Sequence, residues 1–191
     1  MEEVARRRLH HQIFPWMKQV NERWQAPPPG VVRLDVDASV RDNQYAACGG
    51  VIRDENRDWI MGFQKLLGTH PIMIAEILAI KTGLEVCRDL KFTHVQVFSD
   101  LLEAVNILMR DSGTQHPFRD EIEATRQLLY ENWNLSIQYA DREAIECADC
   151  LAKKAHDVDG QTVLLPDIPS YCRSRILLDP HHVVEGSNVH M

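Results

Sequence analysis

The amino-acid sequence predicts a mixed α/β fold, in which helices flank a five-stranded mixed sheet with three antiparallel strands first and parallel additions after them. Three short segments with alternating apolar and polar residues open the domain, and the polar connection 54–58 between the second and third indicates a hairpin. From residue 72 the apolar residues follow a helical period, and two more strand-like segments alternate with helices, which is typical of parallel additions. The five predicted strands cover residues 31–37, 46–53, 59–66, 93–99 and 133–140.

Composition and charge restrict the class of protein. With 191 residues the chain is long enough for one well-buried domain with extensions, and 45% hydrophobic and 26% charged residues are ordinary for a globular protein. The net charge of −7 argues against a broad phosphate-binding surface, but a nuclease remains open because metal ions neutralise an acidic site. Five cysteines and a charged start without an apolar signal region indicate a cytoplasmic or nuclear protein. No apolar run has membrane-spanning length, and we expect a monomer without a membrane partner.

The chain divides into four segments. Residues 1–24 carry apolar positions at helical spacing and predict an N-terminal helical extension. The proline-rich segment 25–30 predicts a stiff, extended linker into the main domain, which we expect to cover residues 31–158. Residues 159–191 form a C-terminal extension whose polar tail we expect to be disordered.

Four helices follow the first three strands. The first of them begins after Gly68 and Pro71 and carries an acid, Glu76, in the middle of its apolar stripe. The last carries Asp149 at the edge of a stripe of small apolar residues. The four predicted helices cover residues 72–90, 101–109, 116–130 and 143–156.

Four acids in apolar elements are the candidate functional residues. Asp37 lies in the first strand, Asp100 directly follows the fourth strand, and these two strands are expected to be parallel neighbours. Glu76 and Asp149 lie on helices that pack on the same sheet. Carboxylates this close repel one another unless cations screen them, and hard oxygen ligands suit Mg²⁺ or Mn²⁺. We therefore expect the four acids to bind two such ions, the arrangement that cleaves phosphodiesters.

The order and spacing of several short motifs resemble the ribonuclease H type I superfamily, most closely its plant reverse-transcriptase-like branch, which is related to retroelements. The matching pieces span about residues 25–180 and are Pro28–Gly30, Leu34–Asp37, Gly49–Asp54, Trp59–Phe63, Ala75–Ile80, Phe98–Asp100, Arg142–Glu143 and Ala148–Lys153. The resemblance implies a ribonuclease H-like fold and a metal-dependent endonuclease that cleaves the RNA strand of RNA–DNA hybrids. It also implies that Asp37, Glu76, Asp100 and Asp149 are both the catalytic and the metal-binding residues.

The chain departs from that family pattern at several positions. Ala38 replaces the usual Gly after the first acid, Leu101 replaces Ser or Thr after the third, and Tyr139 stands where many active members have His. The segment 72–74, Ile-Met-Ile, cannot donate hydrogen bonds to the 2′-hydroxyl groups of a hybrid. We therefore expect weak activity. The alternative is an inactive, retroelement-derived module that binds nucleic acid or protein.

Two other interpretations are less favoured. A proofreading exonuclease needs Asp-x-Glu in the first strand, whereas the chain has Asp35-x-Asp37, so Asp35 is expected to support the site or lie at the surface. Cys147 and Cys150 have the spacing of metal-binding or redox cysteines, but no second pair accompanies them.

Overall fold

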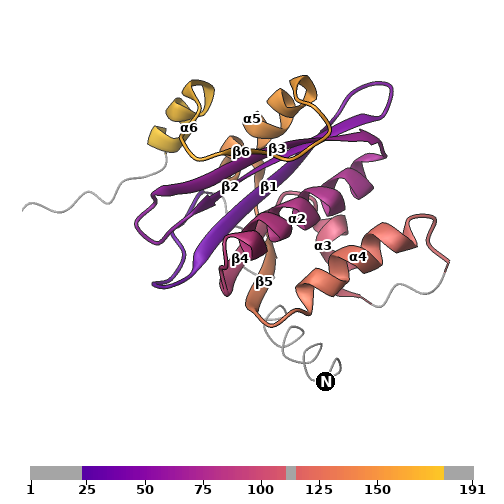
Figure 1. The fold of residues 1–191 in the computed structure, drawn as a ribbon, viewed down its shortest axis with the longest axis horizontal. Helices are drawn as coiled ribbons and strands as arrows, with labels where there is room; N and C mark the ends of the chain where they lie inside the picture. The colour runs from indigo at the N-terminus through magenta and orange to yellow at the C-terminus, as the bar shows by residue number, and fades with distance from the viewer. Residues whose placement is uncertain (1–22, 111–114, 179–191) are drawn as a thin grey trace, which may run out of the picture.

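The computed structural model describes residues 23–110 and 115–178. A mixed sheet with the strand order β5-β4-β1-β2-β3-β6 forms its centre, with α2, α3 and α4 on one face and α5 and α6 on the other (Figure 1). The strands are β1 (Val32–Val40), β2 (Tyr45–Arg53), β3 (Trp59–Thr69), β4 (His94–Ser99), β5 (Asn134–Tyr139) and β6 (Val163–Leu165). The helices are α2 (Ile72–Asp89), α3 (Leu102–Met109), α4 (Arg119–Leu129), α5 (Glu146–Lys154) and α6 (Arg173–Leu178), with 3₁₀ turns η1 (Arg142–Ala144), η2 (Ala155–Asp157) and η3 (Ser170–Cys172).

The predicted strand directions are confirmed, but the predicted number of strands is wrong. Strands β1, β2 and β3 pair antiparallel, and β4 and β5 add in parallel beside β1. A sixth strand, β6, pairs antiparallel with β3 at the opposite edge of the sheet. Its three residues are too few to show an alternating pattern, so pairing with the free edge of β3 makes this segment a strand.

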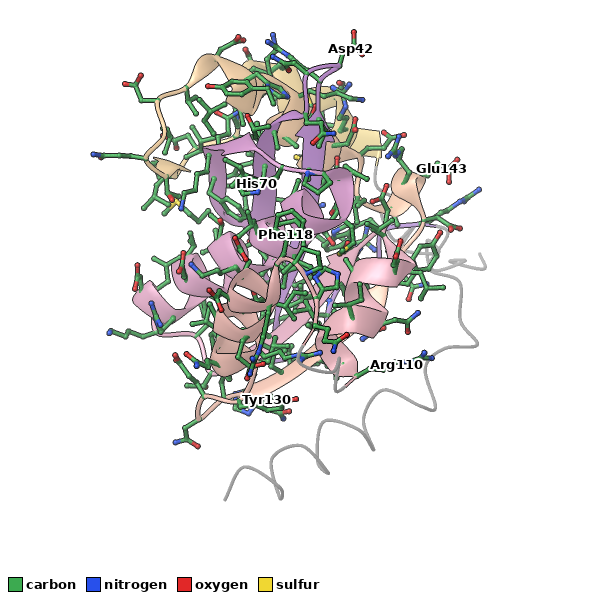
Figure 2. The ribbon with its side chains drawn as sticks, turned by 90° about the vertical axis from the view of Figure 1, so that its right-hand side faces the viewer. Asp42, His70, Arg110, Phe118, Tyr130 and Glu143 are labelled. Carbon is green, nitrogen blue, oxygen red and sulfur yellow. The ribbon has the colours of Figure 1, made fainter. Side chains whose placement is uncertain are left out.

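Helix α2 covers the apolar face of β1 at close range. Leu34 and Val36 point to this face, and a side chain added at Gly83 of α2 would approach them to 2.8 Å and 3.0 Å. Helix α4 packs on the outer side of α2, and Phe118 and Tyr130 mark its two ends (Figure 2). The close contact of α2 with β1 therefore fixes the distance between the sheet and Glu76, the acid on α2.

Helix α5 lies directly on the opposite face of the sheet. A Cβ atom at Gly49 of β2 would lie 2.4 Å from the backbone nitrogen of Ala152, so only glycine permits this contact. The predicted last helix, 143–156, is wrong in extent, because α5 covers only Glu146–Lys154 between two 3₁₀ turns. Ile145 interrupts the helix, since its φ of −126° and ψ of 22° lie outside the helical region.

Residues before β1 also belong to the packed structure. The Trp24 side chain is 4% exposed and stacks on the guanidinium group of Arg53, 3.8 Å from the ring centre. Residues 25–30 contain neither helix nor strand and end in a turn, in which the N–H of Val31 donates a hydrogen bond to the carbonyl of Pro28 at 3.1 Å. The predicted helix over 1–24 falls almost wholly outside the described residues, and so do the last ten residues, for which disorder was expected. Within the described ranges, no helix is long and apolar enough to cross a membrane.

Candidate metal centre

Asp37 lies where the sheet opens beside β1. The parallel pairing of β1 with β4 extends only from Val32 to Asp35, so the neighbouring strand no longer covers β1 at Asp37. The residue is 1% exposed, and its Oδ1 has no hydrogen-bond partner in the described part of the protein. A buried carboxylate oxygen without a partner is unfavourable, so this atom requires a cation or a proton.

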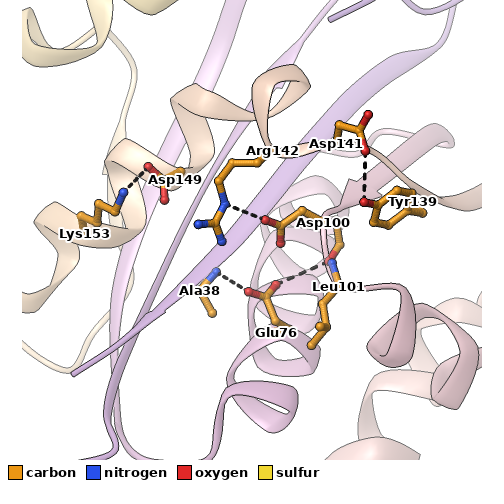
Figure 3. A network of polar contacts seen from close by, with 10 residues as sticks. Ala38, Glu76, Asp100, Leu101, Tyr139, Asp141, Arg142, Asp149 and Lys153 are labelled. Carbon is orange, nitrogen blue, oxygen red and sulfur yellow. Dashed lines mark hydrogen bonds and ion pairs between the residues drawn. The ribbon is translucent and has the colours of Figure 1, made fainter. Parts of the chain in front are cut away.

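Glu76 enters the same opening from α2. It is 2% exposed, and its Oε1 accepts a hydrogen bond from the backbone N–H of Ala38 at 3.0 Å (Figure 3). Its Oε2 accepts a weaker one from the Ser99 hydroxyl at 3.4 Å. These contacts from β1 and β4 hold the carboxylate in the gap between the two strands, which explains why an acid stands within an apolar helical stripe.

Asp100 completes a compact group of three acids. It directly follows β4, and its Oδ2 accepts a hydrogen bond from Nε of Arg142 at 3.0 Å (Figure 3). Carboxylate oxygens of Asp37, Glu76 and Asp100 all lie within 4.8 Å of one another. The parallel register of β1 and β4 therefore brings the first and third acids together, and α2 adds the second.

Burial and mutual repulsion perturb the titration of this group. Burial, followed by the charges of Glu76 and Asp100, raises the pKa of Asp37 to about 9. Burial, followed by the charge of Asp100, raises the pKa of Glu76 to about 8, against the hydrogen bond from Ala38. Near neutral pH both carboxyl groups therefore retain protons in the absence of a cation.

The donor set fits a hard divalent cation. All the ligand atoms of the three-acid group are carboxylate oxygens, which suit Mg²⁺ or Mn²⁺ better than soft metals. The unpartnered Oδ1 of Asp37 points to the same conclusion. Because the carboxyl groups must lose their protons to become ligands, metal binding at this site is coupled to proton release.

The fourth predicted acid, Asp149, lies outside the three-acid group. Its carboxylate on α5 accepts a hydrogen bond from Nζ of Lys153, one helical turn later, at 2.6 Å (Figure 3). It is still close enough for its charge to raise the pKa of Asp37. The structure thus brings Asp37, Glu76 and Asp100 together and holds Asp149 beside them in an ion pair.

Two cations at this site were not read from the sequence as functional residues. Arg142 begins one of the motifs that carry the resemblance and Lys153 ends another, but no functional role was predicted for either. The spacing of Asp149 and Lys153, four residues apart on a helix, is a signal for their ion pair. The contact of Arg142 with Asp100 joins residues 42 positions apart and has no such local signal.

Asp35 is a structural residue. It is 2% exposed and accepts hydrogen bonds from Nε of Arg33 at 2.7 Å and from Nε1 of Trp24 at 2.8 Å. The guanidinium of Arg33 also lies 3.9 Å from the centre of the Phe98 ring. Asp35 therefore neutralises a buried arginine, and both of its carboxylate oxygens have partners outside the three-acid group.

Tyr139 and His156 have hydrogen-bond partners outside the three-acid group. The Tyr139 hydroxyl donates a hydrogen bond to Asp141 at 3.1 Å (Figure 3). Nε2 of His156 lies 3.1 Å from the Ser39 hydroxyl, and burial lowers the pKa of this imidazole.

Solved structures define the class of fold. RNase H1 from the halophilic archaeon Halobacterium salinarum NRC-1 matches with a TM-score of 0.62 and 26% identity, over 66% of this chain and 98% of that one. LC11-RNase H1, solved in complex with an RNA/DNA hybrid, matches with a TM-score of 0.59 and 22% identity, over 66% and 96% of the two chains. At that identity the second match shows the fold alone. The fold is thus ribonuclease H-like, as the resemblance implied.

The family follows from the sequence. The model of the reverse transcriptase-like family matches residues 35–155, more than half of the chain, so the chain belongs to the reverse transcriptase-like family. A protein of Arabidopsis thaliana, provisionally named as a ribonuclease H protein, is 29% identical over 133 residues. The match covers 69% of this chain and 22% of that protein, so the matched part of the chain spans about a fifth of the relative's length.

Proposed function

We propose that this chain is a metal-dependent endonuclease that hydrolyses the RNA strand of RNA–DNA hybrids. The observation that carries the proposal is the group formed by Asp37, Glu76 and Asp100, whose carboxylate oxygens lie within 4.8 Å of one another. Burying two of these acids is unfavourable unless cations are bound for part of the functional cycle. The fold and the hybrid-bound ribonuclease H of the same fold support the choice of reaction and substrate.

In this proposal Asp37, Glu76 and Asp100 hold Mg²⁺ or Mn²⁺, and Asp149 completes the ligand set of a second ion after leaving Lys153. When bound, such ions activate water for in-line attack on a phosphodiester and stabilise the leaving 3′-oxygen. Ala38 and Ser99 keep Glu76 oriented through their hydrogen bonds to its carboxylate.

Arg142 and Lys153 have a second role in the proposal. Their side chains are 68% and 62% exposed, although each is paired with an acid of the site. Once metal ions neutralise Asp100 and Asp149, both cations are released and can contact a phosphate of the substrate. The same two residues therefore screen the acids before loading and supply positive charge afterwards.

Recognition of the hybrid is expected to be weak. At the start of α2, Ile72 is 49% exposed and offers no hydrogen bond, Met73 is half-buried, and Ile74 is fully buried in the core. If the 2′-hydroxyl groups of the RNA strand find no polar partner on the protein, affinity for the hybrid depends on scattered Lys and Arg side chains. Binding should therefore weaken steeply with salt.

A cleavage assay tests the proposed function. The parent protein, Asp100→Asn and the control Asp42→Asn, which changes an exposed acid in the β1–β2 turn, are incubated with an end-labelled RNA–DNA hybrid and Mg²⁺ or Mn²⁺. We expect cut RNA and intact DNA with the parent and the control, and a loss of roughly a hundredfold or more with Asp100→Asn. Single-stranded RNA and duplex DNA serve as substrate controls.

Two results would overturn the proposal. One is an absence of cleavage by folded parent protein in both metals. The other is equal activity of the parent and Asp100→Asn, because it would assign the cleavage to a contaminating nuclease.

A non-catalytic binding module is the second candidate function. The ion pairs of Asp100 with Arg142 and of Asp149 with Lys153 favour it, because they neutralise part of the acidic group without any metal. This candidate predicts that the parent protein binds the hybrid in the presence of EDTA and leaves it uncut when Mg²⁺ or Mn²⁺ is added.

A further inference from the structure

A hydroxyl–imidazole pair lies beyond the acidic group, and the metal centre does not use it. Nε2 of His156 lies 3.1 Å from Oγ of Ser39. Ser39 stands near the end of β1, and His156 stands in η2, directly after α5. The ring of Tyr45, at the start of β2, lies beside the imidazole, with the ring centres 6.4 Å apart. Residues from three separate elements therefore meet at this pair.

Both β1 and α5 lead from predicted metal ligands to this pair. Asp37 and Ser39 are two residues apart on β1, so their side chains point to the same face of the sheet, about 7 Å apart along the strand. Asp149 lies on α5, and His156 follows about two helical turns later. The pairing of β1 with β4 ends at Asp35. The pair therefore borders the same opening as the three acids, one step further along β1.

The imidazole directs the hydroxyl of Ser39. Nδ1 of His156 is buried and has no hydrogen-bond partner in the part of the chain that the structure describes. A buried N–H group without an acceptor is unfavourable, so the proton of the neutral imidazole belongs on Nε2. Burial, followed by the charge of Arg41, lowers the pKa of His156 and so favours the neutral ring. Nε2–H then donates to Oγ of Ser39, and the hydroxyl proton of Ser39 is available to a further acceptor.

An exposed positive charge stands beside the hydroxyl. Arg41 begins the turn between β1 and β2, and its backbone N–H donates a hydrogen bond to the carbonyl of Tyr45 at 3.0 Å. This bond holds the start of the turn next to the ring that lies beside His156. The neighbouring acids Asp42 and Asp157 are exposed, so water and salt screen their charges. A hydroxyl donor near an exposed guanidinium suits a phosphate, which is charged and has several acceptor oxygens.

We propose that Ser39 and Arg41 bind a backbone phosphate that flanks the scissile phosphate of the nucleic-acid substrate, and that His156 is the positioning residue for the Ser39 hydroxyl. The proposal rests on the proposed function, in which the acids around Asp37 hold the scissile phosphate. The distance of about 7 Å along β1 is similar to the spacing of successive phosphates along one strand. This subsite reads neither base nor 2′-hydroxyl group, so it adds affinity for the hybrid without adding selectivity for RNA.

Hybrid binding tests the two phosphate contacts. A fluorescein-labelled RNA–DNA hybrid is titrated with protein in EDTA, so that it stays uncut, and fluorescence anisotropy is followed over a series of salt concentrations. Ser39→Ala should weaken binding by roughly tenfold and leave the salt dependence unchanged, because it removes a hydrogen bond but no charge. Arg41→Gln should also weaken binding and reduce the slope of log K against log salt by about 0.9.

Variants of His156 test its positioning role. His156→Ala should weaken hybrid binding as Ser39→Ala does, whereas His156→Gln, whose side-chain N–H can still donate to the hydroxyl, should restore part of the affinity. In the Ser39→Ala protein, His156→Ala should cause no further loss, because the imidazole acts through the hydroxyl. Urea unfolding of each variant separates this from a merely structural role, which would lower the free energy of unfolding and would not depend on Ser39.

A second hydroxyl–imidazole pair supplies the matched control. Oγ1 of Thr93 lies 3.0 Å from Nδ1 of His94 at the start of β4, whereas Asp100 follows the end of that strand. Thr93→Ala should therefore bind the hybrid as tightly as the parent. Lys91→Gln removes an exposed charge from the same region and should leave the salt slope unchanged.

The outcomes separate this subsite from the proposed function. Parent-like binding by Ser39→Ala, equal losses in Ser39→Ala and Thr93→Ala, additive losses from Ser39→Ala and His156→Ala, or no hybrid binding by the parent would each overturn the subsite. Cleavage by the parent would then still support the nuclease. Binding that depends on Ser39, without cleavage in Mg²⁺ or Mn²⁺, would support the subsite and overturn the nuclease.

Discussion

Replacing Asp37 by Asn should stabilise the metal-free protein, by an amount that depends on pH. In the folded protein burial and neighbouring acids raise the pKa of Asp37 from 3.8 to about 9. The folded state therefore favours the protonated acid. The contribution of Asp37 to stability is fully present below pH 4 and is lost progressively as pH rises towards 9.

The magnitude follows from the size of this shift. At pH 7, which is about three pH units above the ordinary pKa of 3.8, Asp37 is ionised in the unfolded chain but must take up a proton on folding. At about 1.4 kcal/mol per unit this costs up to about 4 kcal/mol. Asn needs no proton on folding and keeps a polar side chain of the same shape. The gain in free energy of unfolding of Asp37→Asn over the parent should therefore approach but not exceed that figure at pH 7, and vanish near pH 4.

Urea unfolding in EDTA measures the effect. The free energy of unfolding is compared for the parent, Asp37→Asn and the exposed-acid control Asp42→Asn at pH 4, 7 and 9. We expect the difference between Asp37→Asn and the parent to grow with pH, and the control to stay level with the parent. Adding Mg²⁺ or Mn²⁺ should then stabilise the parent more than Asp37→Asn. An equal difference at all three pH values would refute the reasoning.

Three further predictions concern the surroundings of the acidic group. Arg142→Gln removes a cation 3.0 Å from Asp100 and should tighten Mn²⁺ binding by up to roughly fivefold in calorimetric titration; weaker binding would show that Arg142 supports the ligands. Gly49→Ala should lower the free energy of unfolding by ~1–3 kcal/mol, because the new Cβ meets the α5 backbone, and an unchanged denaturation midpoint would contradict this. Met73→Asn should strengthen hybrid binding in a fluorescence anisotropy assay at moderate salt, and an unchanged dissociation constant would show that hybrid recognition does not depend on this position.

The sequence predicted those features that depend on local pattern. Alternation in the first strand placed Asp37 on the face opposite Leu34, and the helical stripe around Glu76 placed that acid towards the sheet. Parallel pairing of the first and fourth strands then implied that Asp37 and Asp100 end side by side, and the three acids do converge. These inferences succeeded because strand and helix periodicity fix the direction of a side chain.

Features that depend on contacts between distant segments could not be predicted in this way. The strand β6 exists only because the edge of β3 is free to pair with it. No local pattern indicated that Asp35 is buried. One of its hydrogen-bond donors is Trp24, which lies in a segment without helix or strand, and the other is Arg33 on the same strand. Cys172 likewise joins Cys147 and Cys150 in one buried cluster through the path of the C-terminal segment, which no local pattern describes.

The packing of Trp24 and of β6 has a practical consequence for defining the smallest stable fragment. The family match begins at residue 35, inside β1, and ends at residue 155, before β6. A fragment cut to those limits would lose the ring that covers Arg53 and the strand that pairs with β3. It would also uncover Cys147, Cys150 and Leu151 to solvent. Expression boundaries for this chain should therefore lie outside residues 23 and 178, because a fragment trimmed to the residues that match the family would present an unpaired sheet edge and an apolar helix face to its neighbours in solution.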